Sequence, residues 1–195
     1  MVSFPPLLPD AGWCSRFFRS LMIGKTETQA IEEANSALRN ARELTRFSIK
    51  GNNGNSITLS MAVEGGNRKL RHRVLPPDIN LSEHGDWRKV HLGALEACLG
   101  KKPFYPYIIE SISKTYNDRE LKTPADFNTA IFETLKAFLM KGLYSEDLLE
   151  FERNEKIRLR GKEIAENIGT ELSCVQAIAQ YGREALIGFM ALAPV

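Results

Sequence analysis

Apolar residues recur every three or four positions over most of the chain, which is the spacing of amphipathic helices. Thr123-Pro124 is typical of a helix start, and Gly100 and Gly142 of helix ends. Asp86 stands where the N-cap of one of these helices is expected. Helices are predicted at Trp13–Met22, Thr26–Arg42, Trp87–Leu99, from Pro106, from Pro124 to Gly142, and at Ser145–Phe151, Gly161–Ile168, Ser173–Tyr181 and Arg183–Ala193.

The period of the pattern changes to two between Thr45 and Val63, and this predicts a β-hairpin. Asn53-Gly54, at its middle, tolerates positive φ and favours a tight reversal. Alternate residues of a strand point to the same face, so one side of the sheet is expected to be buried. The residues expected on that side are Ile57, Leu59, Met61 and Val63. A third strand is predicted near 72–75, before Pro76-Pro77.

These elements predict the α+β class: a small antiparallel sheet built on the hairpin at about 45–63, with a predominantly helical C-terminal half. The 195 residues are most simply one domain. Within a single domain of residues 1–195, we expect an irregular N-terminal start and the hairpin in 1–81, and a helical part in 82–195.

Composition narrows the functional classes. The 26 Lys and Arg residues nearly balance the 24 Asp and Glu residues, which argues against a nucleic-acid-binding protein. No apolar run approaches the roughly 20 residues of a membrane span, and the start does not resemble a signal peptide. Three widely spaced cysteines predict reduced thiols, so a cytoplasmic protein is expected. The sequence shows no dinucleotide, phosphate-loop or metalloprotease motif, and it therefore predicts no cofactor and no metal.

The stretch Ser82–Tyr107 is the richest in chemistry. Trp87 and His91 lie four residues apart and share one face of the predicted helix. His91 falls within the apolar stripe, which leaves two interpretations. It is either a core histidine bonded to neighbouring groups, or a general base that faces a cleft, since its ordinary pKa lies close to neutral pH.

The neighbouring candidates carry the same two interpretations. Trp87 is a core residue or a ligand platform, and Arg88 binds an anion at the mouth of a site or pairs with a nearby acid. Tyr105 stacks on a sugar ring or serves as a hinge between helices. Arg46, on the hairpin, binds substrate or faces solvent. The basic run 68–73 is a solvated edge strand or a strip that attracts phosphate.

Several of these segments resemble one family. The pattern W-x-x-x-H, an apolar helix and then Gly-Lys-x-Pro-aromatic-aromatic is similar to the WbqC-like family of bacterial proteins. Further similarity lies in Leu8-Pro9-x-x-Gly12-Trp13, in Thr45–Ile49 and in Gly169–Ser173. The chain departs from the family pattern at Met61-Ala62, where a Pro is common, and at Gln176, where an acid is common.

The resemblance implies an association with O-antigen and other surface-polysaccharide clusters. It also implies transfer of an acyl or aminoacyl group to a sugar or, as an alternative, glycosyl transfer. By their positions in the family pattern, the resemblance implies that the site residues are Arg46, Trp87, Arg88, His91 and Tyr105, with His91 as the catalytic base.

Two functional hypotheses follow. The first is a transferase that acts on an amino sugar and holds a nucleotide- or lipid-linked sugar. The alternative is a non-catalytic member of a biosynthetic complex that binds a sugar or a protein. A protein partner or a second copy of the chain fits either hypothesis.

Overall fold

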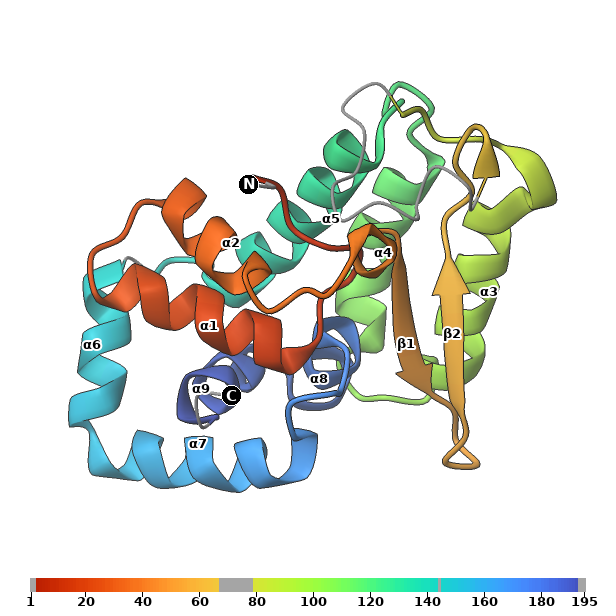
Figure 1. Ribbon diagram of the computed structural model, residues 1–195. Helices are drawn as coiled ribbons and strands as arrows, with labels where there is room; N and C mark the ends of the chain where they lie inside the picture. The colour runs from red at the N-terminus through yellow and green to blue at the C-terminus, as the bar shows by residue number, and fades with distance from the viewer. Residues whose placement is uncertain (1–2, 67–78, 144, 193–195) are drawn as a thin grey trace.

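The computed structural model in Figure 1 describes residues 3–66, 79–143 and 145–192. Its α-helices are α1 Ala11–Met22, α2 Glu27–Asn35, α3 Trp87–Leu99, α4 Tyr105–Asn117, α5 Pro124–Leu139, α6 Ser145–Arg153, α7 Glu155–Ile168, α8 Cys174–Tyr181 and α9 Ala185–Ala191. Short 3₁₀ helices are η1 Ala41–Leu44, η3 His84–Asp86 and η4 Gly182–Glu184, and the strands are β1 Arg46–Lys50 and β2 Ser56–Ser60. The α+β class is confirmed. The third strand predicted near 72–75 and the basic run 68–73 lie outside the described residues.

One predicted helix is divided into two pieces. The helix expected over Thr26–Arg42 begins at a capping box between Thr26 and Gln29, but it ends at Asn35. Ser36 donates its hydroxyl hydrogen to the carbonyl of Glu33 at 2.6 Å, and the side chain of Asn40 caps the separate helix η1. Local side-chain bonds of this kind compete with a continuous helix, which explains the break.

The starts of two later helices contrast with each other. Thr123 caps α5 by accepting a hydrogen bond from the backbone of Asp126, and Pro124 opens the helix as predicted. Asp86 precedes α3 but makes no side-chain cap, and its φ of 46° places it in the left-handed region. Asp86 therefore occupies the predicted N-cap position of α3, but its side chain does not cap the helix.

The predicted hairpin is present. Strands β1 and β2 pair antiparallel with Phe47 opposite Leu59 and Ile49 opposite Ile57, and Gly54 adopts a φ of 81° in the turn. Leu59 is buried as expected, as are Met61 and Val63 beyond the strand. Ile57 is 41% exposed, so its predicted burial is wrong. It lies next to the turn, where the hairpin projects past the helices that cover its base (Figure 1).

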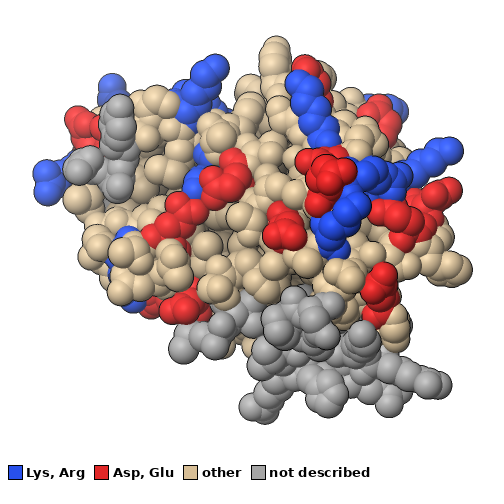
Figure 2. Space-filling view, turned by 90° about the horizontal axis from the view of Figure 1, so that it is seen from above, with Lys and Arg blue, Asp and Glu red and all other residues tan. Residues whose placement is uncertain are grey.

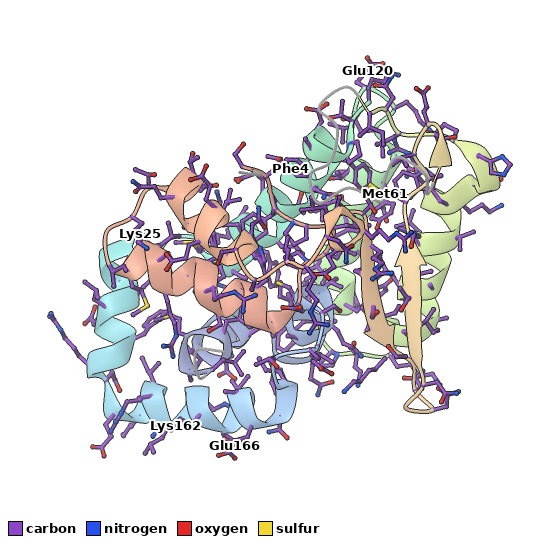
Figure 3. The ribbon with its side chains drawn as sticks, in the orientation of Figure 1. Phe4, Lys25, Met61, Glu120, Lys162 and Glu166 are labelled. Carbon is purple, nitrogen blue, oxygen red and sulfur yellow. The ribbon has the colours of Figure 1, made fainter. Side chains whose placement is uncertain are left out.

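Helices α7 and α9 pack against each other with unusually close backbones. A Cβ atom added at Gly188 would lie 2.4 Å from Cγ2 of Ile164, and one at Gly161 would lie 2.8 Å from the carbonyl oxygen of Ile187. Glu166 projects from α7 away from the helices that it supports (Figure 3). No helix in the described ranges is both long enough and apolar enough to cross a bilayer.

The N-terminal segment, residues 4–10, has bends but no helix or strand before α1 begins (Figure 1). Two buried asparagines hold it. Asn35 donates to the carbonyl of Phe4 at 2.9 Å, and Asn128 donates to the carbonyl of Pro5 at 3.0 Å. Leu8, in the middle of the segment, has a φ of 43°. This left-handed conformation is rare for residues other than glycine.

Candidate functional site

His91 lies in the core, with a partner at each ring nitrogen. Its Nε2 is 3.2 Å from the carbonyl oxygen of Ser60, and its Nδ1 is 3.1 Å from the hydroxyl of Tyr116. Burial lowers the pKa of His91 to about 4. The ring is 1% exposed and lines none of the three cavities described below. Its catalytic role stays a prediction, and this setting supports the interpretation as a core histidine.

Trp87 shares the face of α3 with His91, as predicted, and their ring centroids lie 5.1 Å apart. Its indole Nε1 donates to the carbonyl oxygen of Ser82 at 2.7 Å. The rings of Tyr116 and Phe127 complete an aromatic cluster around it. Trp87 is therefore placed in the core, and its role in binding substrate stays a prediction.

Arg88 is buried, although a position on the surface was expected. Its guanidinium donates to the carbonyl oxygens of Tyr116, Asp118 and Leu121 at 3.0 to 3.3 Å, and it pairs with Glu83. The guanidinium carbon also lies 4.9 Å from the ring centroid of Trp87. Nη1 and Nη2 thus donate to carbonyls at and just beyond the end of α4, and so Arg88 fastens that end to α3.

Tyr105 and Arg46 lie apart from this cluster. The hydroxyl of Tyr105 is buried, and burial together with the nearby Glu96 carboxylate raises its pKa. Arg46 is exposed on β1. Tyr105, like His91, lines none of the three cavities described below. Arg46 lines a cavity beside β1.

This N-terminal cavity has a volume of about 640 Å³, within the range of small-molecule sites. Its walls come from four parts of the chain: the N-terminal segment with the start of α1, the turn after α2, strand β1, and the residues before and within α8. The lining residues include Pro9, Asp10, Gly12, Trp13, Arg16, Arg39, Glu43, Arg46, Lys50, Thr170, Glu171, Leu172, Ser173 and Gln176.

Two smaller or shallower cavities lie elsewhere. One of about 330 Å³ borders α7 and α9 and includes Arg19 and Met190. The other, of about 620 Å³, is a groove beside Phe104 and Tyr107. Neither contains a residue from the predicted site.

Backbone pairing holds the walls of the N-terminal cavity together. The backbone N–H of Cys174 donates to the carbonyl of Pro9 at 2.7 Å, and that of Ala11 donates to Leu172 at 2.8 Å. Gly12 approaches Thr170 so closely that an added Cβ would lie 3.2 Å from its carbonyl oxygen. The two segments of the family resemblance, Leu8–Trp13 and Gly169–Ser173, therefore lie side by side.

Gln176 joins strand β1 to the same wall. Its amide accepts a hydrogen bond from the backbone N–H of Lys50 at 3.0 Å and donates to the carbonyl of Lys50 at 2.9 Å. A carboxylate could accept but not donate, so the amide is the group that suits this contact. The substitution of Gln for the acid common in the resembling family thus has a structural reason in this chain.

Basic side chains at the cavity are available to a ligand. Within the described residues, the guanidinium of Arg46 and the ammonium of Lys50 have no hydrogen-bond or ion-pair partner. Arg16 donates from Nε to the carbonyl of Ala34 at 3.4 Å, which leaves its other donors free. Elsewhere the charges are mixed in sign, as on the face shown in Figure 2. Unpaired cations at a concave surface are suited to a phosphate or carboxylate.

The site predicted from the sequence lies mainly on α3 and does not include the polar groups of this cavity, chiefly Asp10 and Ser173. The available signal was the pair of short segments that carry the family resemblance. Each contains a Pro or Gly and a polar residue directly before a helix. Nothing in their spacing indicated that segments so distant in the chain would meet.

The comparisons with known proteins agree with the resemblance. The model of the WbqC-like protein family matches residues 35–172, more than half of the chain. The match includes Arg46 on β1 and Thr170–Leu172 in the opposite wall, whereas the N-terminal segment lies outside it. No curated protein and no solved structure shows a significant match. The chain belongs to the WbqC-like protein family.

Proposed function

We propose that this protein binds a sugar phosphate in the N-terminal cavity and transfers an acyl or aminoacyl group to an amino sugar in bacterial surface-polysaccharide biosynthesis. Nucleotide-linked and lipid-linked sugars both carry a phosphate ester at the anomeric carbon. This shared part is the group that the cavity would recognise. The polysaccharide context comes from the family resemblance, and the choice of cavity comes from the geometry.

The observation that carries the proposal is the unpaired guanidinium of Arg46 in the cavity wall. Arg46 lies within the residues that match the family and lines a cavity that the segments Leu8–Trp13 and Gly169–Ser173 also line. A planar guanidinium can hold two phosphate oxygens at once, and such charge-assisted bonds are stronger than neutral ones. Lys50 on the same strand and Arg39 in the turn after α2 also line the cavity and add positive charge.

Binding of glucose 1-phosphate, measured by titration calorimetry, tests the proposal. We expect Arg46→Gln to weaken binding about tenfold or more, since a hydrogen bond to a charged group contributes about 1.5–3 kcal/mol. Arg158→Gln is the matched control, because Arg158 is exposed and lines a different cavity. The proposal fails if wild-type protein does not bind the probe at millimolar concentration, or if both variants bind as wild type does.

The burial of His91 favours the alternative, a binding protein without catalytic activity, because the predicted base does not face the cavity. Mass spectrometry separates the two. Glucosamine 1-phosphate is incubated with the protein and a small-molecule extract that contains activated acyl donors. A protein-dependent mass gain on the amino sugar supports the transferase, and binding without a mass gain supports the alternative.

A further inference from the structure

Asp10 and Ser173 face each other across an isolated antiparallel bridge. The bonds from Cys174 to Pro9 and from Ala11 to Leu172 flank this pair and do not join it directly. Asp10 and Ser173 are thus a non-hydrogen-bonded pair, in which the two Cα atoms approach to about 4.5 Å and the side chains lie on the same side. Both residues line the N-terminal cavity.

The hydroxyl of Ser173 lacks a partner. The residue is 2% exposed, and its Oγ has no hydrogen bond among the described residues. Although Ser173 stands at the N-cap of α8, its side chain makes no cap bond. A buried hydroxyl left unpaired costs free energy, and a ligand atom in the cavity would satisfy it.

The carboxylate of Asp10 has one engaged oxygen. Its Oδ1 accepts the backbone N–H of Trp13 at 2.7 Å, and the second oxygen has no bond within the described residues. The surrounding protein raises the pKa of Asp10 by desolvation, against the lowering effects of the Trp13 and Gly12 N–H groups and of Arg16. Glu43, on η1, raises it further. The carboxylate is thus a stronger base than an ordinary surface aspartate.

We infer that Asp10 and Ser173 form the end of the cavity that binds the amine of an amino sugar, with Asp10 as its proton acceptor. The inference rests on the proposed function, in which the cations across the cavity hold the phosphate. The amine nitrogen bonds to the carbonyl carbon of an acyl ester or thioester, and the bond from that carbon to the leaving oxygen or sulfur breaks. The proton released by nitrogen passes to Asp10 and from there to the leaving group.

Two probes that differ in one group test the inference. Glucosamine 1-phosphate carries an amine where glucose 1-phosphate carries a hydroxyl, so the ratio of their dissociation constants isolates recognition of the amine. At pH 6.5 we expect wild-type protein to prefer the amine about tenfold, through an ion pair with Asp10. Asp10→Asn should bring the ratio close to one, and Asn keeps the cap on α1. Ser173→Ala should reduce the preference about threefold or more.

Ser15→Ala is the matched control. Its hydroxyl is also buried without a partner among the described residues, but it does not line the cavity. The control should keep the preference of the wild type, and thermal melting should show that all three variants are folded. Equal binding of both probes by wild-type protein, or an unchanged ratio in Asp10→Asn, overturns the inference and leaves the proposed function standing. Failure of both probes to bind wild-type protein refutes the proposed function itself.

Discussion

The hydroxyl of Tyr116 lies 3.1 Å from Nδ1 of His91. This contact and the one between Nε2 and Ser60 determine which nitrogen of the buried ring carries the hydrogen. The carbonyl oxygen of Ser60 can only accept, so Nε2 of His91 carries the hydrogen and donates it. Nδ1 of the neutral ring then accepts from Tyr116. The imidazole joins the end of β2 to α4 through α3, which is a structural task.

Acidification should destabilise the protein through His91. Its folded pKa of about 4 is below the ordinary 6.5, so the unfolded chain binds the proton more readily. The associated stability is present above pH 6.5 and is lost as the pH falls toward 4, with a total of about 3 kcal/mol. Urea unfolding at several pH values checks this. His91→Gln should flatten the dependence in that window, and an equally steep dependence in the variant would exclude His91 as its source.

Removal of the Tyr116 hydroxyl should destabilise the fold. Tyr116→Phe leaves Nδ1 of His91 buried without a donor, at a cost of about 1–3 kcal/mol. Tyr107→Phe is the control because Tyr107 is 70% exposed, and it should change the free energy of unfolding by less than about 0.5 kcal/mol. Chemical denaturation of both variants gives the comparison. Similar losses in the two would show that the bond to His91 is unimportant.

Replacement of Arg88 even by lysine should destabilise the protein. Arg88→Lys keeps the charge but loses the fork that reaches three carbonyls, and we expect a cost of roughly 3 kcal/mol. Lys89→Gln, on the exposed side of the same helix, should be nearly neutral. Thermal melting measures both. A melting temperature for Arg88→Lys equal to that of wild type would contradict the fastening role of this side chain.

Gly188 and Gly93 should respond in opposite ways to the same substitution. Gly188→Ala places a methyl against Ile164 and should cost about 1–3 kcal/mol or more through overpacking. Gly93→Ala, on α3, meets nothing within 4 Å and should stabilise by about 0.5–1 kcal/mol. Denaturant midpoints of the two variants test the pair. Stabilisation by both substitutions would mean that α7 and α9 can move apart without a decrease in the free energy of unfolding.

The sequence was sufficient for what depends on neighbours in the chain. Helix α3, its stripe with Trp87 and His91, and the hairpin turn at Gly54 all follow from local spacing. The partners of His91 could not be predicted, because Ser60 and Tyr116 are distant in sequence and are brought to it by packing. The burial of Arg88 was missed for the same reason. Its pairing with a nearby acid, Glu83, was one of the two expectations, but its three other partners are backbone carbonyls, which cannot be recognised from residue type.

The N-terminal cavity could not be predicted because its walls are likewise distant in sequence. Arg46 was predicted as a site residue from the resemblance, and it lines the cavity, but the opposite wall depends on pairing between Pro9 and Cys174. Polar residues such as Asp10 and Ser173 at helix starts are usually caps, and Asp10 is one. Ser173 differs from such a cap only because its side chain makes no cap bond.

The bridge between Asp10 and Ser173 has a consequence for synthesis of the protein. During translation, the N-terminal segment leaves the ribosome long before residues 170–174 are synthesised. The backbone groups of Pro9 and Ala11 therefore have no hydrogen-bond partners in Leu172 and Cys174 until then. Contacts between such distant segments form slowly, because a long loop has to close first. The cavity is therefore assembled late, and any ligand that requires both walls will bind only chains whose synthesis has passed residue 174.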